Sequence, residues 1–260
     1  MKNFRTWGKK PFKVAVVHGG PGDPGYMAPV ARELSKSTGV LEPLQTKNSI
    51  DGQVEELADV LKKQADIPIV LIGHSWGATL SYITTARHPN LIKRLVLIGT
   101  VPLGAKDMPD YMPILLDRLS EEERVEFLSL EKLVWDGGAE DKSEPMGRLF
   151  RLITKAEAYE PIPHKNEVLE YQLDINMAVG LEVRKLLAGG ELMELGSKIA
   201  CPVVAIHGDF DVRPADDVKG SLSRILKDFK FILLEKCGHE PWVERHAREK
   251  FFEILKKEIG

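Results

Sequence analysis

The fold of this chain is decided by the stretch Ile67-Pro68-Ile69-Val70-Leu71-Ile72-Gly73-His74-Ser75-Trp76-Gly77-Ala78. Residues 67–72 form an apolar run rich in β-branched side chains, as in a strand buried on both faces of a parallel sheet. Residues 73–77 predict a turn, and residues 78–87 predict a helix. A further apolar run follows at residues 91–98. The order strand, turn, helix, strand predicts a right-handed parallel crossover, and therefore a doubly wound α/β sheet.

Similar patterns occur on both sides of this stretch. Apolar runs predict further strands at residues 12–17, 40–44, 202–207 and 229–234. Helical spacing occurs at residues 30–34, 50–64, 216–226 and 240–259. The sequence therefore predicts a mostly parallel sheet of about six strands between helices.

The alternation of strands and helices stops between Val101 and Ser197. No run rich in valine and isoleucine occurs there, and helical patterns dominate, including one that begins with Ser-x-x-Glu at Ser120. We interpret residues 101–198 as an inserted helical cap. The core would then consist of residues 1–100 and 199–260.

Composition excludes several classes of protein. The 260 residues are 43% hydrophobic and 29% charged, which is typical of a globular protein that folds without metals or disulfides. A net charge of −3 argues against a nucleic-acid partner, and no apolar run is long enough for a membrane partner. The two cysteines, Cys201 and Cys237, are placed at opposite ends of neighbouring strands, so no disulfide is expected. Without an export signal, the expected location is cytoplasmic.

The turn Gly73-His74-Ser75-Trp76-Gly77 matches a nucleophile elbow, in which a serine lies on a strained turn between a strand and a helix. Glycines are required there because a side chain would collide with the neighbouring strand or helix. Ser75 is therefore the predicted nucleophile. The structural alternative is a tight turn whose serine caps the helix.

A serine hydroxyl needs a base to remove its proton and a carboxylate to orient that base. His239 follows the last predicted strand and is the predicted base. Asp211 follows the strand before it and is the predicted acid, with Asp209 as its nearest rival. The order Ser, Asp, His is the order that a nucleophile elbow requires.

A tetrahedral intermediate needs hydrogen-bond donors for its oxyanion. The predicted donors are the backbone N–H groups of Trp76, after the nucleophile, and Gly20, in the loop after the first predicted strand. Gly19 is the alternative for the second donor. His18 is expected to brace this loop. We find no spacing typical of metal ligands, so neither a metal nor a cofactor is expected.

The segments His18-Gly19-Gly20-Pro21-Gly22 and Gly73-His74-Ser75-Trp76-Gly77 resemble the proline iminopeptidase branch of the α/β-hydrolase superfamily. Two features depart from that branch. Its members usually carry a hairpin before the oxyanion strand, whereas only about a dozen residues precede it here, which implies a shortened N-terminal part of the sheet. The branch also tends to have glycine in place of His74.

These observations predict a cofactor-independent serine hydrolase that cleaves an ester or amide of a small substrate, or a short peptide. A proline iminopeptidase-like aminopeptidase is one alternative, and it would need buried carboxylates for the substrate ammonium. The cap offers several acidic residues, none of which the sequence assigns to that role: Glu140, Asp141, Glu144, Glu157 and Glu160. A second alternative is a non-catalytic relative that binds a ligand or a protein partner. A third, haloperoxidase or perhydrolase activity, would be a side reaction of an esterase.

Overall fold

A seven-stranded sheet lies at the centre of the computed structural model, which describes residues 2–103, 110–135, 142–165 and 167–260. The strands are β1 (Phe4–Trp7), β2 (Phe12–Val17), β3 (Gly39–Pro43), β4 (Ile69–His74), β5 (Ile92–Ile98), β6 (Val203–Gly208) and β7 (Phe229–Leu234). Their order in the sheet is β1-β3-β2-β4-β5-β6-β7. All neighbouring pairs are parallel except β1 and β3. The predicted α/β class with a mostly parallel sheet is confirmed.

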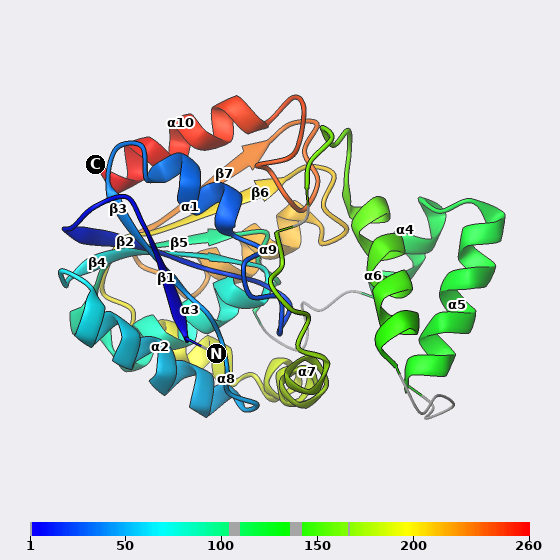
Figure 1. Ribbon diagram of the computed structural model, residues 1–260, viewed down its shortest axis with the longest axis horizontal. Helices are drawn as coiled ribbons and strands as arrows, with labels where there is room; N and C mark the ends of the chain where they lie inside the picture. Colours follow the sequence, from blue (N-terminus) through cyan, green and yellow to red (C-terminus); the bar gives the residue numbers. More distant parts are fainter. Residues whose placement is uncertain (1, 104–109, 136–141, 166) are drawn as a thin grey trace.

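Helices cover both faces of this sheet (Figure 1). One face packs against α1 (Ala28–Leu34) and α10 (Arg248–Ile259). The other packs against α2 (Ile50–Gln64), α3 (Trp76–Arg87), α8 (Glu191–Gly196) and α9 (Ala215–Ser223). The central strands are buried on both sides, which explains why their sequences are continuous apolar runs.

Between β5 and β6 the described chain contains the helices α4 (Met112–Asp117), α5 (Glu121–Trp135), α6 (Ser143–Glu157) and α7 (Leu173–Gly189) before α8. Helices α4, α5 and α6 share a small apolar core of their own and lie to one side of the sheet (Figure 1). Ser120 Oγ accepts the N–H of Glu123, and Glu123 Oε2 accepts the N–H of Ser120, so the Ser-x-x-Glu pattern forms a capping box. Reading this segment as a cap remains an interpretation.

The structure adds one strand to the expected sheet and shortens the last helix relative to the sequence expectation. The sheet has seven strands, one more than the six located by apolar runs, because β1 is a short edge strand with Arg5 and Thr6 at its centre. The last helix begins at Arg248, not Glu240. Residues 241–247 form turns whose backbone pairs with residues 160–162 rather than within a helix, through an isolated bridge between Glu244 and Pro161 and hydrogen bonds of Val243 and Arg245.

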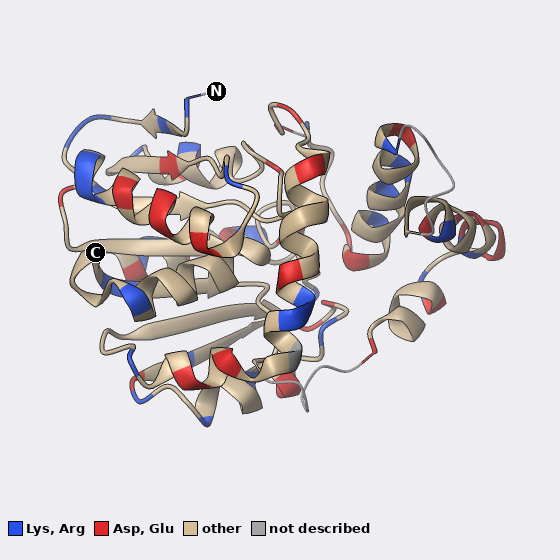
Figure 2. Ribbon diagram, turned by 90° about the horizontal axis from the view of Figure 1, so that it is seen from below, with Lys and Arg blue, Asp and Glu red and all other residues tan. Residues whose placement is uncertain are grey.

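Charged residues of both signs occur along the helices seen in Figure 2. No helix in the described part of the chain is long and apolar enough to cross a membrane.

Candidate active site

Ser75 lies in a strained turn between β4 and α3. Its φ of 55° and ψ of −121° place a non-glycine residue in a region that L-amino acids rarely adopt. The N–H of Ser75 donates to the carbonyl of Ile98 at the end of β5, at 2.9 Å, which fixes the turn against the sheet. Such strain persists only where the surroundings impose it, and it is typical of functional turns.

The two glycines of the turn are required by close packing. A Cβ on Gly77 would collide with the carbonyl oxygens of Val17 and His18. A Cβ on Gly73 would collide with the backbone of Gly77. The steric reason inferred from the sequence therefore holds at both positions, and it explains how α3 approaches the end of β2 so closely.

Asp211 and His239 meet beyond the ends of β6 and β7. His239 Nδ1 lies 2.6 Å from Asp211 Oδ2. Because a carboxylate only accepts, Nδ1 carries the proton and Nε2 is left with a free lone pair. Both residues are buried. Burial disfavours the charged form of His239, but Asp211 and Glu157 outweigh it and raise the pKa of His239 above its usual value.

The carboxylate of Asp211 is held ionised. Its burial opposes ionisation, but His239 and Arg213 outweigh that effect and keep the pKa of Asp211 well below its usual range. The rival acid, Asp209, is exposed and accepts the N–H of Cys237 at 3.1 Å. The structure therefore brings Asp211, and not Asp209, against His239.

The loop after β2 lies against the elbow. A Cβ on Gly19 would come within 3.1 Å of Ser75 Cβ, so this loop passes directly beside the serine. Gly20 has a φ of 108°, which favours glycine. Trp76 is the first residue of α3, where a backbone N–H has no carbonyl partner within the helix. The predicted donors Gly20 and Trp76 thus belong to segments adjacent to Ser75, and their role remains a prediction.

Two neutral histidines support these loops. His18 Nδ1 donates to the carbonyl of Gly19 at 2.9 Å, and His18 Nε2 accepts the N–H of Gln45 at 3.1 Å. Burial lowers the pKa of His18 to about 4. His74 Nε2 donates to the carbonyl of His239 at 3.1 Å, and burial holds the pKa of His74 well below its usual range. His18 braces the loop, as expected from the sequence.

A cavity of about 620 Å³ opens beside His239, with Glu240 and Val243 on one wall. The opposite wall is formed by the last turns of α6 and the segment that follows, including Arg151, Lys155, Glu157, Tyr159 and His164. A hollow of about 630 Å³ near β1 and α2 is lined by none of Ser75, Asp211 and His239.

Comparison with known proteins agrees with this arrangement. The family model described as alpha/beta hydrolase fold matches residues 14–245. The chain belongs to the α/β-hydrolase family. Most of the sheet and all of the residues discussed above fall inside the matched region.

Individual α/β-hydrolases resemble the chain at low sequence identity. A proline iminopeptidase of Saccharolobus solfataricus is 23% identical, with 95% of this chain and 84% of that protein aligned. A solved structure of a serine hydrolase involved in carbazole degradation has a TM-score of 0.63 at 18% identity, covering 98% of this chain and 92% of that one. A meta-cleavage product hydrolase from Pseudomonas fluorescens has a TM-score of 0.63 at 16% identity, covering 98% and 92%. The two structures show a shared fold.

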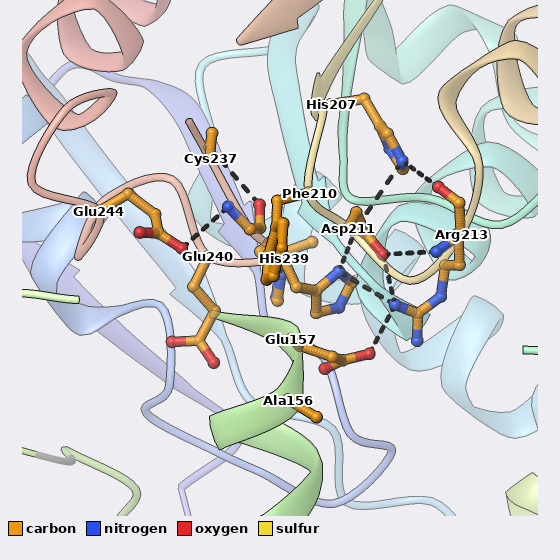
Figure 3. Close-up of polar contacts among 12 residues, drawn as sticks. Ala156, Glu157, His207, Phe210, Asp211, Arg213, Cys237, His239, Glu240 and Glu244 are labelled. Atoms are coloured by element: carbon orange, nitrogen blue, oxygen red, sulfur yellow. Dashed lines mark hydrogen bonds and ion pairs between the residues drawn. The ribbon is translucent and has the colours of Figure 1, made fainter. Parts of the chain in front are cut away.

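The sequence analysis missed Arg213 at the site of this α/β-hydrolase. Arg213 Nη1 lies 3.0 Å from Asp211 Oδ1, 2.8 Å from Glu157 Oε1 and 3.2 Å from His239 Nδ1 (Figure 3). Glu157, Asp211 and His239 offer ligand atoms within 4.8 Å of one another, a spacing that suits a metal ion. The guanidinium already contacts all three. An arginine two residues after the predicted acid was the available sequence signal.

The acidic residues named for the cap separate into distinct groups. Glu157 is buried at the site, whereas Glu144 and Glu160 pair with arginines outside it. Glu140 and Asp141 lie outside the described residues. Sequence reasoning also missed two acidic groups near the cavity, Glu240 and Asp23.

Glu240 accepts a hydrogen bond from the hydroxyl of Tyr26 and lines the cavity. Burial raises the pKa of Glu240. Burial and the charge of Glu240 also raise the pKa of Asp23 to about 7. Carboxyl groups therefore lie on the core side of the cavity as well as on α6.

Proposed function

We propose that this α/β-hydrolase is a serine hydrolase that cleaves an ester or amide bond of a small substrate. In the first step His239 Nε2 removes the proton of the Ser75 hydroxyl as its oxygen attacks the substrate carbonyl carbon. Asp211 stabilises the imidazolium that forms and keeps His239 in the tautomer that can accept at Nε2.

The tetrahedral oxyanion would be bound by the N–H groups of Gly20 and Trp76. His239 then returns its proton to the leaving alkoxide or amine, which leaves an acyl group on Ser75. Water, deprotonated by His239, attacks this acyl-enzyme and releases the acid. This chemistry uses side chains and backbone donors of the chain itself.

The 2.6 Å contact between His239 Nδ1 and Asp211 Oδ2, taken together with the strained backbone of Ser75, is the observation that carries the proposal. A structural turn would not need φ of 55° at Ser75 together with a buried and ionised carboxylate on the neighbouring loop.

Replacing the serine tests the proposal. Ser75→Ala is expected to lower kcat on p-nitrophenyl acetate by a factor of about 10⁴ or more, because nucleophilic catalysis is lost. Ser223→Ala, at an exposed position at the end of α9, is the matched control and should keep the wild-type rate. A Ser75→Ala protein that retains a substantial rate would refute the assignment.

A proline iminopeptidase-like aminopeptidase is the second candidate. Two observations favour it: the similarity to a proline iminopeptidase along 95% of the chain, and the carboxyl groups beside the cavity. A buried carboxylate such as Glu240 would compensate the substrate ammonium. Glu240→Gln should then reduce turnover of proline p-nitroanilide by at least about tenfold more than turnover of p-nitrophenyl acetate. Equal losses on both substrates would favour an esterase.

A non-catalytic binding protein is the remaining alternative. Fluorophosphonate probes react with an activated serine and form a covalent adduct at its oxygen. We expect mass spectrometry to locate such an adduct on Ser75 in the wild type and to find none on Ser75 in the Asp211→Asn variant. An unlabelled wild-type protein that is folded would support the binding role.

A further inference from the structure

The side chain of Arg213 lies at the site, 17% exposed, and donates hydrogen bonds to Asp211 of the predicted triad and to Glu157. Its backbone N–H and its Nη1 both donate to Asp211 Oδ1, each at 3.0 Å. The other oxygen of Asp211, Oδ2, faces His239. The two carboxylate oxygens thus have separate partners, and a rotation of the Asp211 side chain would break all of these contacts together.

Glu157 brings the end of helix α6 to the same point. Its Oε1 accepts from Arg213 Nη1 at 2.8 Å. Its backbone carbonyl accepts the N–H of His239 at 2.9 Å. One residue of the helical segment therefore contacts both the loop that carries Asp211 and the loop that carries His239, although it lies more than 50 positions before either (Figure 3).

We propose that Arg213 and Glu157 are positioning residues of this site: Arg213 fixes the orientation of Asp211 toward His239, and Glu157 fixes Arg213 and balances its charge. The inference deepens the proposed function and rests on it. It gives the helical segment a part in the chemistry, beyond the shape of the cavity.

Counting charges supports the second part of the proposal. A carboxylate and an imidazolium alone sum to zero when His239 holds the proton. Adding Arg213 would make that state positive in a buried site, where unbalanced charge is costly. Adding Glu157 as well restores neutrality. Consistent with this, Arg213 acts to lower the pKa of His239, while Asp211 and Glu157 act to raise it.

Six titratable groups face His239, and each variant below changes one of them, Glu157 or Arg213, and leaves the other five in place. They come from the end of β6, the loop after it, the end of α6, the elbow and the histidine loop itself: His207, Asp211, Arg213, Glu157, His74 and Glu240. Burial lowers the pKa values of His74 and His207, whereas the pKa of His239 is raised, so both lose their protons at a lower pH than His239.

The test follows the titration of His239 by NMR, using protein labelled at the Cε1 carbons of its seven histidines and a His239→Gln sample for assignment. Glu157→Gln keeps the size and the acceptor oxygen but removes the negative charge. We expect the midpoint of His239 to fall by about one pH unit, because the charge of Arg213 is then unbalanced. Arg213→Gln should shift the midpoint in the opposite direction.

The acid limb of kcat/KM should shift with these midpoints, since His239 must be neutral to act as the base. Matched controls come from the neighbouring exposed pair: Glu160→Gln and Arg245→Gln should leave the midpoint in place. Arg213→Lys, which keeps the charge but has no planar fork, should lower kcat and leave the midpoint close to that of the wild type.

An unchanged His239 midpoint in Glu157→Gln, or shifts in the same direction in both Gln variants, would overturn the inference. Glu157→Gln decides the matter alone if circular dichroism shows that Arg213→Gln does not fold. The NMR midpoints do not depend on turnover, so a failure of the proposed function, seen as full activity in Ser75→Ala, would be distinguished from a failure of this inference.

Discussion

At the scale of single residues, the site depends on how a carboxylate divides its hydrogen bonds. Asp211 receives a ring N–H on one oxygen, and a backbone N–H and a guanidinium N–H on the other. Asp209, two positions earlier, instead accepts the N–H of Cys237 and ties the two loops together. Two carboxylates only two positions apart thus have different roles: Asp211 binds His239, and Asp209 holds the loop that follows β7.

Substitution of each aspartate by asparagine separates these tasks. Asp211→Asn removes the charge that stabilises the His239 imidazolium and favours the wrong tautomer, and by analogy with the serine-protease case kcat should fall by about 10⁴. Asp209→Asn keeps an oxygen that can accept from Cys237, so its rate should stay within about threefold of the wild type. Steady-state kinetics on p-nitrophenyl acetate measures both, and the reverse order of damage would show that Asp209 is the acid.

At the scale of elements, side-chain hydrogen bonds help to attach the edge strand β1 to β3, in addition to the antiparallel pairing of the two strands. Glu42 on β3 is fully buried, and it accepts from Arg5 Nε at 2.9 Å, Arg5 Nη2 at 2.7 Å and Trp7 Nε1 at 2.7 Å. Apolar runs in the sequence located the six other strands, but β1 has no such run. Its side chains bind Glu42, almost 40 positions away, and the local sequence does not reveal that contact.

Removing the arginine should therefore weaken the fold. Arg5→Met leaves the buried carboxylate of Glu42 with Trp7 Nε1 as its one remaining side-chain donor. We expect the free energy of unfolding to fall by about 2 kcal/mol. This is less than the usual cost of breaking a buried ion pair, because Arg5 is partly exposed. Lys36→Met, which removes an exposed ion pair with Glu33, is the control and should change it by less than about 0.5 kcal/mol. Urea unfolding measures both, and equal losses would contradict the structural role of Glu42.

At the scale of the whole molecule, buried neutral histidines make stability depend on pH. The pKa of His18 falls from its ordinary value of 6.5 to about 4 because the side chain is buried. The unfolded chain therefore binds this proton first as the pH falls. Stability from this group is complete above the unfolded pKa and is lost between 6.5 and 4, by about 3 kcal/mol in all.

His18→Gln should remove this contribution. The plot of unfolding free energy against pH should become shallower by about 1.4 kcal/mol per pH unit between pH 4 and 6.5. The exposed His164, replaced in the same way, serves as the reference. Urea unfolding at a series of pH values gives the slopes, and an unchanged slope in His18→Gln would show that His18 is not the group that titrates.

Short motifs carry the part of the site that the sequence predicts. The elbow, the oxyanion loop and the two loops after β6 and β7 each lie within a few residues of a strand end, so Ser75, Asp211 and His239 follow from their local context. The contacts of Arg213 with Glu157, and of Tyr26 with Glu240, do not. They join positions far apart in the chain, and only the folded structure brings them together.

The ties between the helical segment and the site also limit protein engineering. Besides Glu157, Asn176 Nδ2 on α7 donates to the carbonyl of Pro21, and the N–H of Gln172 donates to the carbonyl of Gly22, so the loop after β2 is tied as well. In a chimaera, residues 101–198 would be replaced by the equivalent segment of another hydrolase. That replacement would remove the hydrogen bonds that this segment makes to the loops of the site. New substrate preferences should therefore be sought in grafts that retain the side chains of Glu157 and Asn176 and a backbone N–H at position 172.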